Sequence, residues 1–169
     1  MSDVAPDPGI LHFSFTVSDL DRSLRFYVED LGFELVHRQL QEAPYTSRVV
    51  GYPQARLDVA LLALPGELRA RSDHHLELIE YRNPRGERGD ADTYHPGAAH
   101  LALVVDDIHA RHRELVARGV RFVSEPVAIE AGVNRGGFAC YFRDPDEIAL
   151  ELLQRPNGAA PGAGEEGPR

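Results

Sequence analysis

The sequence predicts an α+β fold made of two related βαβββ modules, and two observations carry this prediction. The first is an internal repeat, which determines the architecture of the chain. LHFSFTVSDLDRSLRFYVEDLGF at residues 11–33 is similar to AHLALVVDDIHARHRELVARGVRF at residues 99–122, so that His12 recurs as His100. The second is that three strand-like segments follow the helix of each copy. That pattern is typical of α+β folds and not of doubly wound parallel sheets.

Each copy opens with a strand and continues as an amphipathic helix. In the first copy apolar and polar residues alternate with a period of two, which predicts a half-buried strand. The apolar face holds Leu11, Phe13, Phe15 and Val17, and the other face holds His12, Ser14 and Thr16. Asp19 is a suitable N-cap and Gly32 a suitable C-terminal stop for the helix that follows. The expected apolar stripes are Leu20, Leu24, Tyr27 and Leu31 in the first helix and Ile108, Leu115 and Val116 in the second, which Gly119 ends.

Three strands are expected after each helix, at residues 33–39, 56–64 and 74–81 in the first module and at residues 121–127, 137–143 and 147–154 in the second. Asp144-Pro145-Asp146 predicts a tight turn between the last two strands, with proline at its second position. Glu147 stands where such a turn usually has glycine, and a type I turn is expected to tolerate it. One helix and so few strands cannot close a core alone, so the modules are expected to pair their sheets.

Polar segments rich in Gly and Pro delimit the modules. Residues 1–9 and 156–169 are predicted to be tails, and the composition of the second cannot bury enough apolar surface to order it. NPRGERGDADTYHPG at residues 83–97 divides the body almost in half and is predicted to be a linker. The first module is therefore expected at residues 10–82 and the second at residues 98–155.

Composition and charge exclude several classes of function. The formal net charge of −9 opposes binding to nucleic acid, whose phosphates would be repelled. No apolar run reaches the roughly 18 residues that span a bilayer, so no membrane helix is expected. The N-terminus lacks the basic and apolar regions of a signal peptide. The single cysteine, Cys140, cannot form an internal disulfide, which predicts a cytoplasmic protein with Cys140 buried in a strand.

Four residues of metal-ligand type occupy matched strands of the repeat. His12 and His100 lie on the first strands, and Glu77 and Glu151 lie on the last, each between two apolar residues. A lone strand His or Glu usually faces solvent. Four solvent-facing residues, however, would have no reason to occupy matching strands in both copies. Glu80 is three residues from Glu77 and is expected on the opposite face. Two imidazoles and two carboxylates suit one divalent ion such as Zn, Ni, Co, Mn or Fe.

At these residues the sequence resembles the vicinal oxygen chelate superfamily, which includes glyoxalase I, methylmalonyl-CoA epimerase, extradiol dioxygenases and antibiotic-resistance proteins. The resemblance covers about residues 10–154 and rests on LHFSFTVSDLDRSLRFYVEDLGF, HLELIEY, AHLALVVDDI and YFRDPDEIALELLQ. It implies a curved mixed sheet around a metal cleft, a small-molecule substrate, and a ligand set of His12, Glu77, His100 and Glu151. It also implies a homodimer, and leaves open whether the modules pair within one chain or across the dimer.

The resemblance implies metal-assisted proton transfer next to a carbonyl, by a lyase or an isomerase/epimerase. Glu151 is the first choice of base and Glu77 the second. An Fe(II) extradiol dioxygenase is the runner-up. Tyr141 stands ten residues before the last ligand, as in those enzymes, but Gly132 replaces their acid–base His and Glu77 adds a fourth ligand. A third alternative is a non-enzymatic protein that binds a drug or metabolite, although such members generally lack the ligands.

Two substrates of the superfamily are disfavoured. Its glutathione enzymes have Arg four residues after the first ligand and Asn four after the second, where this chain has Thr16 and Tyr81. Methylmalonyl-CoA epimerase commonly has Gln where this chain has Glu77, and a paired His motif that AHLAL lacks. The candidate substrate contacts are His75, Tyr141, Arg48, Tyr52 and Arg135, with Arg38 and Tyr45 as further candidates. The histidines expected on the surface are His37, His95, His109 and His112.

Overall fold

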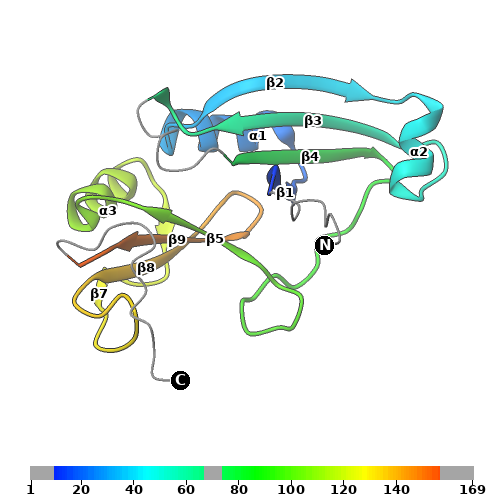
Figure 1. Ribbon diagram of the computed structural model, residues 1–169. Coiled ribbons are helices and arrows are strands. Elements are labelled where there is room, and N and C mark those ends of the chain that lie inside the picture. Colours follow the sequence, from blue (N-terminus) through cyan, green and yellow to red (C-terminus); the bar gives the residue numbers. More distant parts are fainter. Residues whose placement is uncertain (1–9, 67–73, 157–169) are drawn as a thin grey trace, which may run out of the picture. The chain divides into compact units, whose positions relative to one another are not determined.

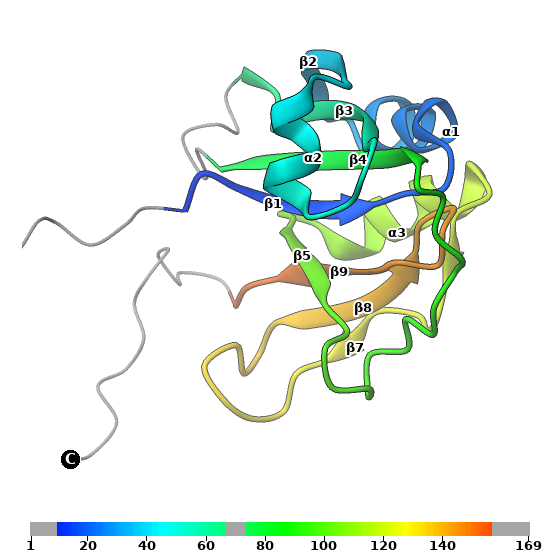
Figure 2. The same ribbon diagram turned by 90° about the vertical axis from the view of Figure 1, so that its right-hand side faces the viewer.

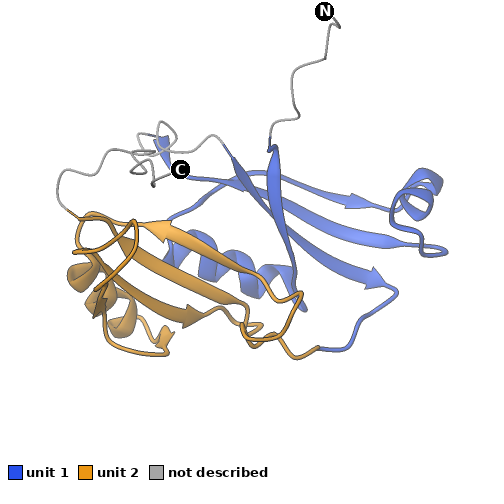
Figure 3. Ribbon diagram, turned by 60° about the horizontal axis from the view of Figure 1, so that its bottom comes forward, with its two compact units in different colours: residues 1–88 blue, residues 89–169 orange. Residues whose placement is uncertain are grey.

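The structure is a computed structural model that describes residues 10–66 and 74–156. The predicted N-terminal tail and all but the first residue of the predicted C-terminal tail lie outside the described residues. The chain divides into two compact units, residues 1–88 and residues 89–169 (Figure 3). The boundary between the units falls inside the segment 83–97, which is rich in polar residues, Gly and Pro.

The first unit has a helix after its first strand and then three further strands, with a short second helix between two of them. Its elements are β1 (His12–Thr16), α1 (Leu20–Leu24), the π-helical turn η1 (Arg25–Asp30), β2 (Glu34–Gln41), α2 (Pro44–Val50), β3 (Arg56–Ala63) and β4 (His75–Asn83). The strands form one sheet in the order β1-β4-β3-β2 (Figure 1). Strands β1 and β4 are parallel and the other pairs are antiparallel, so the sheet is mixed.

The second unit repeats this topology. Its elements are β5 (His100–Val104), α3 (Ile108–Ala117), β6 (Arg121–Phe122), β7 (Val127–Ala128), β8 (Phe138–Arg143) and β9 (Ala149–Gln154). The sheet runs in the order β5-β9-β8-β6. Strand β7 also pairs with β8 (Figure 2). Strands β5 and β9 are parallel, as β1 and β4 are. The prediction of an α+β fold built from two βαβββ repeats is confirmed.

The same local signals begin and end the helix of each unit. The Asp19 carboxylate accepts a hydrogen bond from the Arg22 backbone N–H, and the Asp107 carboxylate accepts one from Ala110, both at 2.9 Å. An N-cap of this kind satisfies one of the backbone donors that a helix start leaves free. Gly32 and Gly119 follow the helices with φ of +83° and +87°, a conformation that favours glycine.

The helices pack on the central strands of their own sheets. Helix α1 contacts β3 and β4, and α3 contacts β9. The fully covered side chains include Leu20, Tyr27, Leu62 and Leu78 in the first unit and Ile108, Leu115, Phe142 and Leu150 in the second. None of the helices in the described part of the chain has the length and hydropathy that crossing a membrane needs.

The apolar stripe of α3 differs from the sequence expectation. His112, expected on the surface, is only 5% exposed, and Val116, expected in the stripe, is 48% exposed. At about 100° per residue, Ile108, His112 and Leu115 lie within roughly 60° of one another around the helix, whereas Val116 lies about 80° from Ile108. The imidazole is therefore buried by its angular position, and its ring packs against Phe122 at a centroid distance of 4.3 Å.

Two segments have local structure that was not predicted from the sequence. Helix α2 was not expected, although Pro44 at its first turn and Gly51 at its end, with φ of +77°, are typical helix boundaries. The strand expected at residues 121–127 is instead the two short strands β6 and β7, each paired to β8. Pro126 lies between them and has no N–H to donate to a continuous ladder.

The turn between β8 and β9 forms, but not with Glu147 in an ordinary conformation. The Glu147 N–H donates to the Asp144 carbonyl at 3.0 Å, as a type I turn requires. Glu147 itself has φ of +64°, in the left-handed region. The turn therefore tolerates Glu147, as expected, although Glu147 bears the backbone strain that glycine would avoid.

Candidate metal and proton-transfer site

Strand register brings His12 and Glu77 together in the first unit. Strand β1 pairs with β4 so that Ser14 lies opposite Glu77 and His12 lies opposite His75. Residues paired across neighbouring strands share a face of the sheet, as do residues two apart along one strand. His12 Nε2 is 3.5 Å from Glu77 Oε2. The two side chains are 37% and 19% exposed, so the pair is accessible to a ligand.

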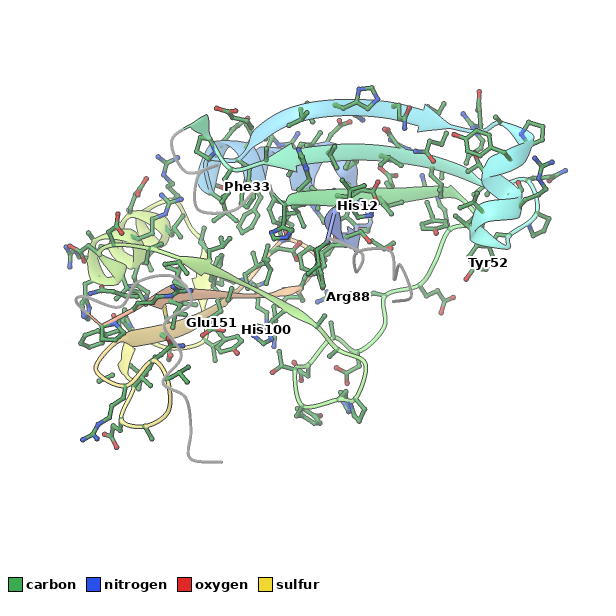
Figure 4. All side chains as sticks on the ribbon, in the orientation of Figure 1. His12, Phe33, Tyr52, Arg88, His100 and Glu151 are labelled. Carbon is green, nitrogen blue, oxygen red and sulfur yellow. The ribbon has the colours of Figure 1, made fainter. Side chains whose placement is uncertain are left out.

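The second unit contains an equivalent pair. Ala102 lies opposite Glu151 in the parallel pairing of β5 and β9, two residues after His100. His100 Nε2 is 3.2 Å from Glu151 Oε2, with side-chain exposures of 41% and 15%. Figure 4 labels His100 and Glu151 on these strands and His12 on β1. Each unit thus holds one His–Glu pair at the same place in its topology.

In each unit a hydrogen bond on the helix side of the last strand orients the glutamate of the His–Glu pair. Three residues after the glutamate of the first unit, the Glu80 carboxylate accepts a hydrogen bond of 2.9 Å from the Leu20 N–H at the start of α1. Three residues after the glutamate of the second unit, Gln154 Oε1 accepts one of 2.8 Å from the Ile108 N–H. Residues three apart on a strand face opposite sides. Each hydrogen bond therefore keeps its glutamate on the side away from the helix, as the sequence predicts for Glu80.

Both pairs have the chemistry and the spacing of metal ligands. Two donors bound to one ion at ~2.1 Å lie about 3.0–3.4 Å apart for bond angles of ~90–109°. The pair of the second unit, at 3.2 Å, is within this range, and the pair of the first unit, at 3.5 Å, is just above it. Across residues 10–66 and 74–156, no group of three or more His, Cys, Asp or Glu side chains is gathered closely enough to hold an ion. Each unit supplies two donors, and the four-ligand set stays a prediction.

A tyrosine accompanies the pair of the second unit. Tyr141 lies opposite Glu151 in the β8–β9 pairing, and its hydroxyl is 3.2 Å from His100 Nε2. Burial, with a further contribution from the Glu151 carboxylate, raises the pKa of Tyr141 above its ordinary value. The predicted substrate contact Tyr141 therefore touches a predicted ligand. The equivalent position opposite Glu77 in the first unit is Leu61.

Tyr81 lies on the site face of the first unit and was not selected from the sequence as a site residue. It is four residues after Glu77, and its ring meets that of Tyr52 edge-on at a centroid distance of 6.1 Å. Burial raises the pKa of Tyr81, and Tyr52 and Glu77 add to the rise. The predicted contact Tyr52 thus adjoins the strand of Glu77. The even spacing between Glu77 and Tyr81 is the signal that could have identified it.

The remaining candidate substrate contacts fall in different environments. His75 shares the face of the His–Glu pair of its unit, because it lies opposite His12. Arg48 is exposed in the last turn of α2, and Arg135 is exposed in the loop before β8. Among the described residues, neither guanidinium hydrogen-bonds to the His–Glu pair of its own unit. Tyr45, at the start of α2, is 52% exposed.

Arg38 does not lie on the site face. Its guanidinium hydrogen-bonds to Asp58 at 3.1 and 2.9 Å and to Asp21 at 2.6 Å. Asp58 is opposite Glu80 in the β3–β4 pairing, on the helix side of the sheet, and also accepts a hydrogen bond of 3.0 Å from Arg82. The hydrogen bonds from Arg38 lower the pKa of Asp58 below its ordinary value. The expectation that Arg38 contacts substrate is therefore wrong, because this ion-pair network occupies it.

Comparison with known proteins agrees with this geometry. The family model described as Glyoxalase/Bleomycin resistance protein/Dioxygenase superfamily matches residues 9–152. A 2-epi-5-epi-valiolone epimerase from an Actinomyces species is 34% identical over 154 residues, which cover 89% of this chain and 81% of that protein. A lactoylglutathione lyase from Haemophilus influenzae is 32% identical over 150 residues, which cover 86% of this chain and 91% of that protein.

Solved structures show the same fold. The crystal structure of a glyoxalase family protein from Bacillus cereus superposes with a TM-score of 0.72, covering 90% of this chain and 99% of that chain at 23% identity. The repeat, the two mixed sheets and the matched sequence therefore agree with the resemblance seen in the sequence. The chain belongs to the glyoxalase/bleomycin resistance protein/dioxygenase superfamily.

Proposed function

We propose that the chain is a metal-dependent epimerase or lyase that moves a proton next to the carbonyl of a small oxygenated metabolite. The observation that carries this proposal is the pair of His–Glu contacts, 3.5 Å in one unit and 3.2 Å in the other, at equivalent places in the two sheets. The similarity to an epimerase and to a lactoylglutathione lyase supports both classes of reaction.

One divalent ion per chain would be held by His12 and Glu77 from the first unit and His100 and Glu151 from the second. Nitrogen and carboxylate donors of this kind suit Fe, Mn, Co, Ni or Zn. When bound, such an ion supplies positive charge next to a substrate oxygen and so favours the enolate that proton removal produces.

A carboxylate of the pair is the proposed base, with Glu151 preferred and Glu77 second. Its oxygen accepts the proton from the carbon next to the carbonyl, and the electrons of the broken C–H bond form the enolate. Return of the proton to the other side of that carbon completes an epimerisation. In a 2-hydroxycarbonyl substrate, return of the proton to the carbonyl carbon, with transfer of the hydroxyl proton to the former carbonyl oxygen, completes an isomerisation. Neither outcome needs an oxidant, because the atoms and electrons of substrate and product are the same.

Tyr141 fits a supporting role on the same face. Its hydroxyl lies 3.2 Å from His100 Nε2, the nitrogen that would bind the ion. A nitrogen lone pair cannot serve both a hydrogen bond and a metal bond, so metal binding would free the hydroxyl for a substrate oxygen.

The Fe(II) dioxygenase is the alternative that the experiment has to exclude. At Gly132, where such enzymes are expected to carry an acid–base His, the chain has no side chain and a φ of +78°. Glu77 also supplies a fourth donor, where oxygen chemistry needs open metal positions.

The metal site is tested by elemental analysis of protein purified without added metal. We expect one ion per chain in the wild type and in a His109→Ala control, and a sharp loss in His12→Ala and in His100→Ala with the fold retained. Full occupancy in both ligand variants would refute the shared site. Loss in one variant alone would restrict the site to one unit.

The reaction is tested by loading the apoprotein under nitrogen with Co, Ni or Zn and, separately, with Fe(II). The probes are 2-epi-5-epi-valiolone, the glutathione hemithioacetal of methylglyoxal, and a panel of catechols. We expect exchange of a substrate α-hydrogen with solvent deuterium, without oxygen consumption, and its loss in Glu151→Gln, whose amide cannot accept the proton. Turnover of a catechol that needs both Fe(II) and O₂ would replace this proposal by the dioxygenase.

A homodimer is part of the proposal, as the superfamily resemblance implies. Light scattering should give a molar mass about twice the 18.7 kDa of the chain. A mass equal to that of one chain at micromolar concentration would contradict it.

A further inference from the structure

The site faces of the two units also differ at the position two residues before each glutamate. His75 and Ala149 each lie two residues before the glutamate of their unit's His–Glu pair. In the two parallel strand pairings, His75 is opposite His12 and Ala149 is opposite His100. A methyl group therefore satisfies the fold at this position in the second unit. The fold consequently gives no reason for an imidazole in the first.

The His75 ring is also incompletely hydrogen-bonded. Its backbone N–H donates to the Leu11 carbonyl at 3.2 Å, which continues the β1–β4 ladder. Its Nδ1 is buried and has no hydrogen-bond partner among the described residues, although the residue as a whole is only half-buried. Buried polar atoms in native proteins nearly always have a partner, so an unpaired one on a ligand-accessible face points to a role other than packing.

The environment of the ring favours one tautomer. A proton on Nδ1 would be a buried donor without an acceptor, and unpaired buried donors are rarer than under-satisfied acceptors. A proton on Nε2 leaves Nδ1 as the unpaired acceptor and makes Nε2–H the only ring donor of the neutral imidazole.

We infer that His75 is a substrate-binding residue that donates a hydrogen bond from Nε2–H to a carbonyl or hydroxyl oxygen of the substrate. This inference rests on the proposed function and adds a specificity element to it. The second unit has Ala149 at the position of His75, so this hydrogen-bond donor is specific to the first unit.

The test uses two amide variants that imitate different ring nitrogens. The Gln side-chain nitrogen reaches about as far as Nε2, and the Asn nitrogen about as far as Nδ1, so His75→Gln should retain the hydrogen bond and His75→Asn should lose it. With the metal-loaded enzyme and 2-epi-5-epi-valiolone, kcat/KM should fall about 10²-fold in His75→Ala and His75→Asn. It should recover by at least tenfold in His75→Gln. His74→Ala, a change at the exposed neighbouring residue, is the matched control and should be unchanged.

Two further readouts separate this inference from the proposed function. Metal content and the thermal midpoint should remain at wild-type values in all three His75 variants, because Ala149 occupies the same place without loss of fold. A fall in metal content would overturn the inference by making His75 a ligand. Long-range ¹H–¹⁵N spectra of ¹⁵N-histidine-labelled protein report the tautomer of each ring, and comparison with His75→Ala assigns the His75 signals. His75 should show the Nε2–H tautomer whether or not the enzyme turns over the probe. An Nδ1–H signal, or equal activity in the Gln and Asn variants, would overturn it. A wild type that binds no metal and exchanges no α-hydrogen would instead overturn the proposed function.

Discussion

Replacing Asp58 by Asn removes the central charge of the network behind the first site without changing the size of the side chain. The Asp58 side chain is 12% exposed and accepts three hydrogen bonds, two from Arg38 and one from Arg82, at 2.9 to 3.1 Å. Asn keeps one acceptor oxygen, and because Arg38 bonds to both oxygens of Asp58, the N–H₂ group faces the Arg38 guanidinium in either orientation of the amide. The substitution therefore leaves two partly buried cations facing a neutral side chain.

The expected loss of stability lies between the limits for exposed and buried ion pairs. Breaking a buried pair costs about 3–5 kcal/mol, whereas an exposed pair contributes about 0–1 kcal/mol. Both guanidiniums are 34% exposed, so water screens them in part. We expect the free energy of unfolding to fall by about 2–3 kcal/mol, which for a chain of this size lowers the thermal midpoint by about 4–12 °C.

Glu114→Gln is the matched control for this measurement. Glu114 also pairs with two arginines, Arg111 and Arg118, but its side chain is 46% exposed. Both substitutions remove one negative charge, and the control should shift the midpoint by no more than about 2–4 °C. Urea unfolding followed by circular dichroism gives the free energies, and calorimetry gives the midpoints. Equal losses in the two variants at pH 7 would refute the argument that burial makes the Asp58 network strong.

The difference in unfolding free energy between wild type and Asp58→Asn should depend on pH in a defined direction. Arg38 lowers the pKa of Asp58 below its usual value of 3.8 in the folded state. A group with a depressed folded pKa contributes stability that is present above its unfolded pKa and is lost as pH falls through the folded value. The difference between wild type and Asp58→Asn should therefore be constant from pH 7 to about pH 5 and should shrink below pH 4. A difference that grows on acidification would show that another group is responsible.

Two further predictions concern single residues of known conformation and burial. Gly51→Ala should lower the free energy of unfolding by about 1–2 kcal/mol, because Gly51 ends α2 at φ +77° in open space and only backbone strain opposes the methyl group. Gly86→Ala, also in open space but without a positive φ, should change it by less than half as much, and equal effects would contradict this reasoning. Burial raises the pKa of Cys140 to about 11, and the residue is 2% exposed, so its thiol should not react with a disulfide reagent at pH 8 until guanidinium unfolds the protein. Reaction of the native protein at the rate of free cysteine would contradict it.

Periodicity and repetition made most of the fold predictable from the sequence. The alternation around His12 and Glu77 required strands, and the repeat required that the second half copy the first. The face of the sheet on which a strand residue lies was also predictable, because it depends on whether its spacing from a neighbouring residue is odd or even. Glu80 was therefore expected on the side of the sheet opposite Glu77. The N-cap residues and glycines marked the helix boundaries through the same local chemistry in both units.

What the sequence did not predict depends on interactions that spacing does not encode. Helix α2 is only seven residues long, too short for a helical period to stand out. The pairing of Arg38 with Asp58 required knowing that β2 adjoins β3 with a bulge between Leu35 and His37, because a bulge shifts which residues share a face. Without that register an arginine on an edge strand resembles a substrate contact. His112 is buried because of its angular position on α3. The sequence prediction relied on its residue type instead and placed it on the surface.

The two units also provide an internal comparison for the residue that fixes each glutamate. Glu80 and Gln154 accept the same hydrogen bond from the first residue of their helices, at 2.9 and 2.8 Å. An amide oxygen therefore suffices for this contact, and Glu80→Gln should retain the hydrogen bond from Leu20. It should lose only the ion pair between Glu80 and Arg82, whose guanidinium is 34% exposed, at a cost of about 1 kcal/mol.

Glu80→Ala removes the acceptor as well as the charge. It leaves the N–H of Leu20, a fully buried residue, without a partner, which adds about 1–3 kcal/mol to the loss. Because Glu80 is three residues from Glu77, metal content measured beside stability reports whether the contact also positions the ligand. We expect metal retention to follow the order wild type, Glu80→Gln, Glu80→Ala. Equal destabilisation by Gln and Ala would show that charge, and not the hydrogen bond shared with the second unit, is what this position contributes.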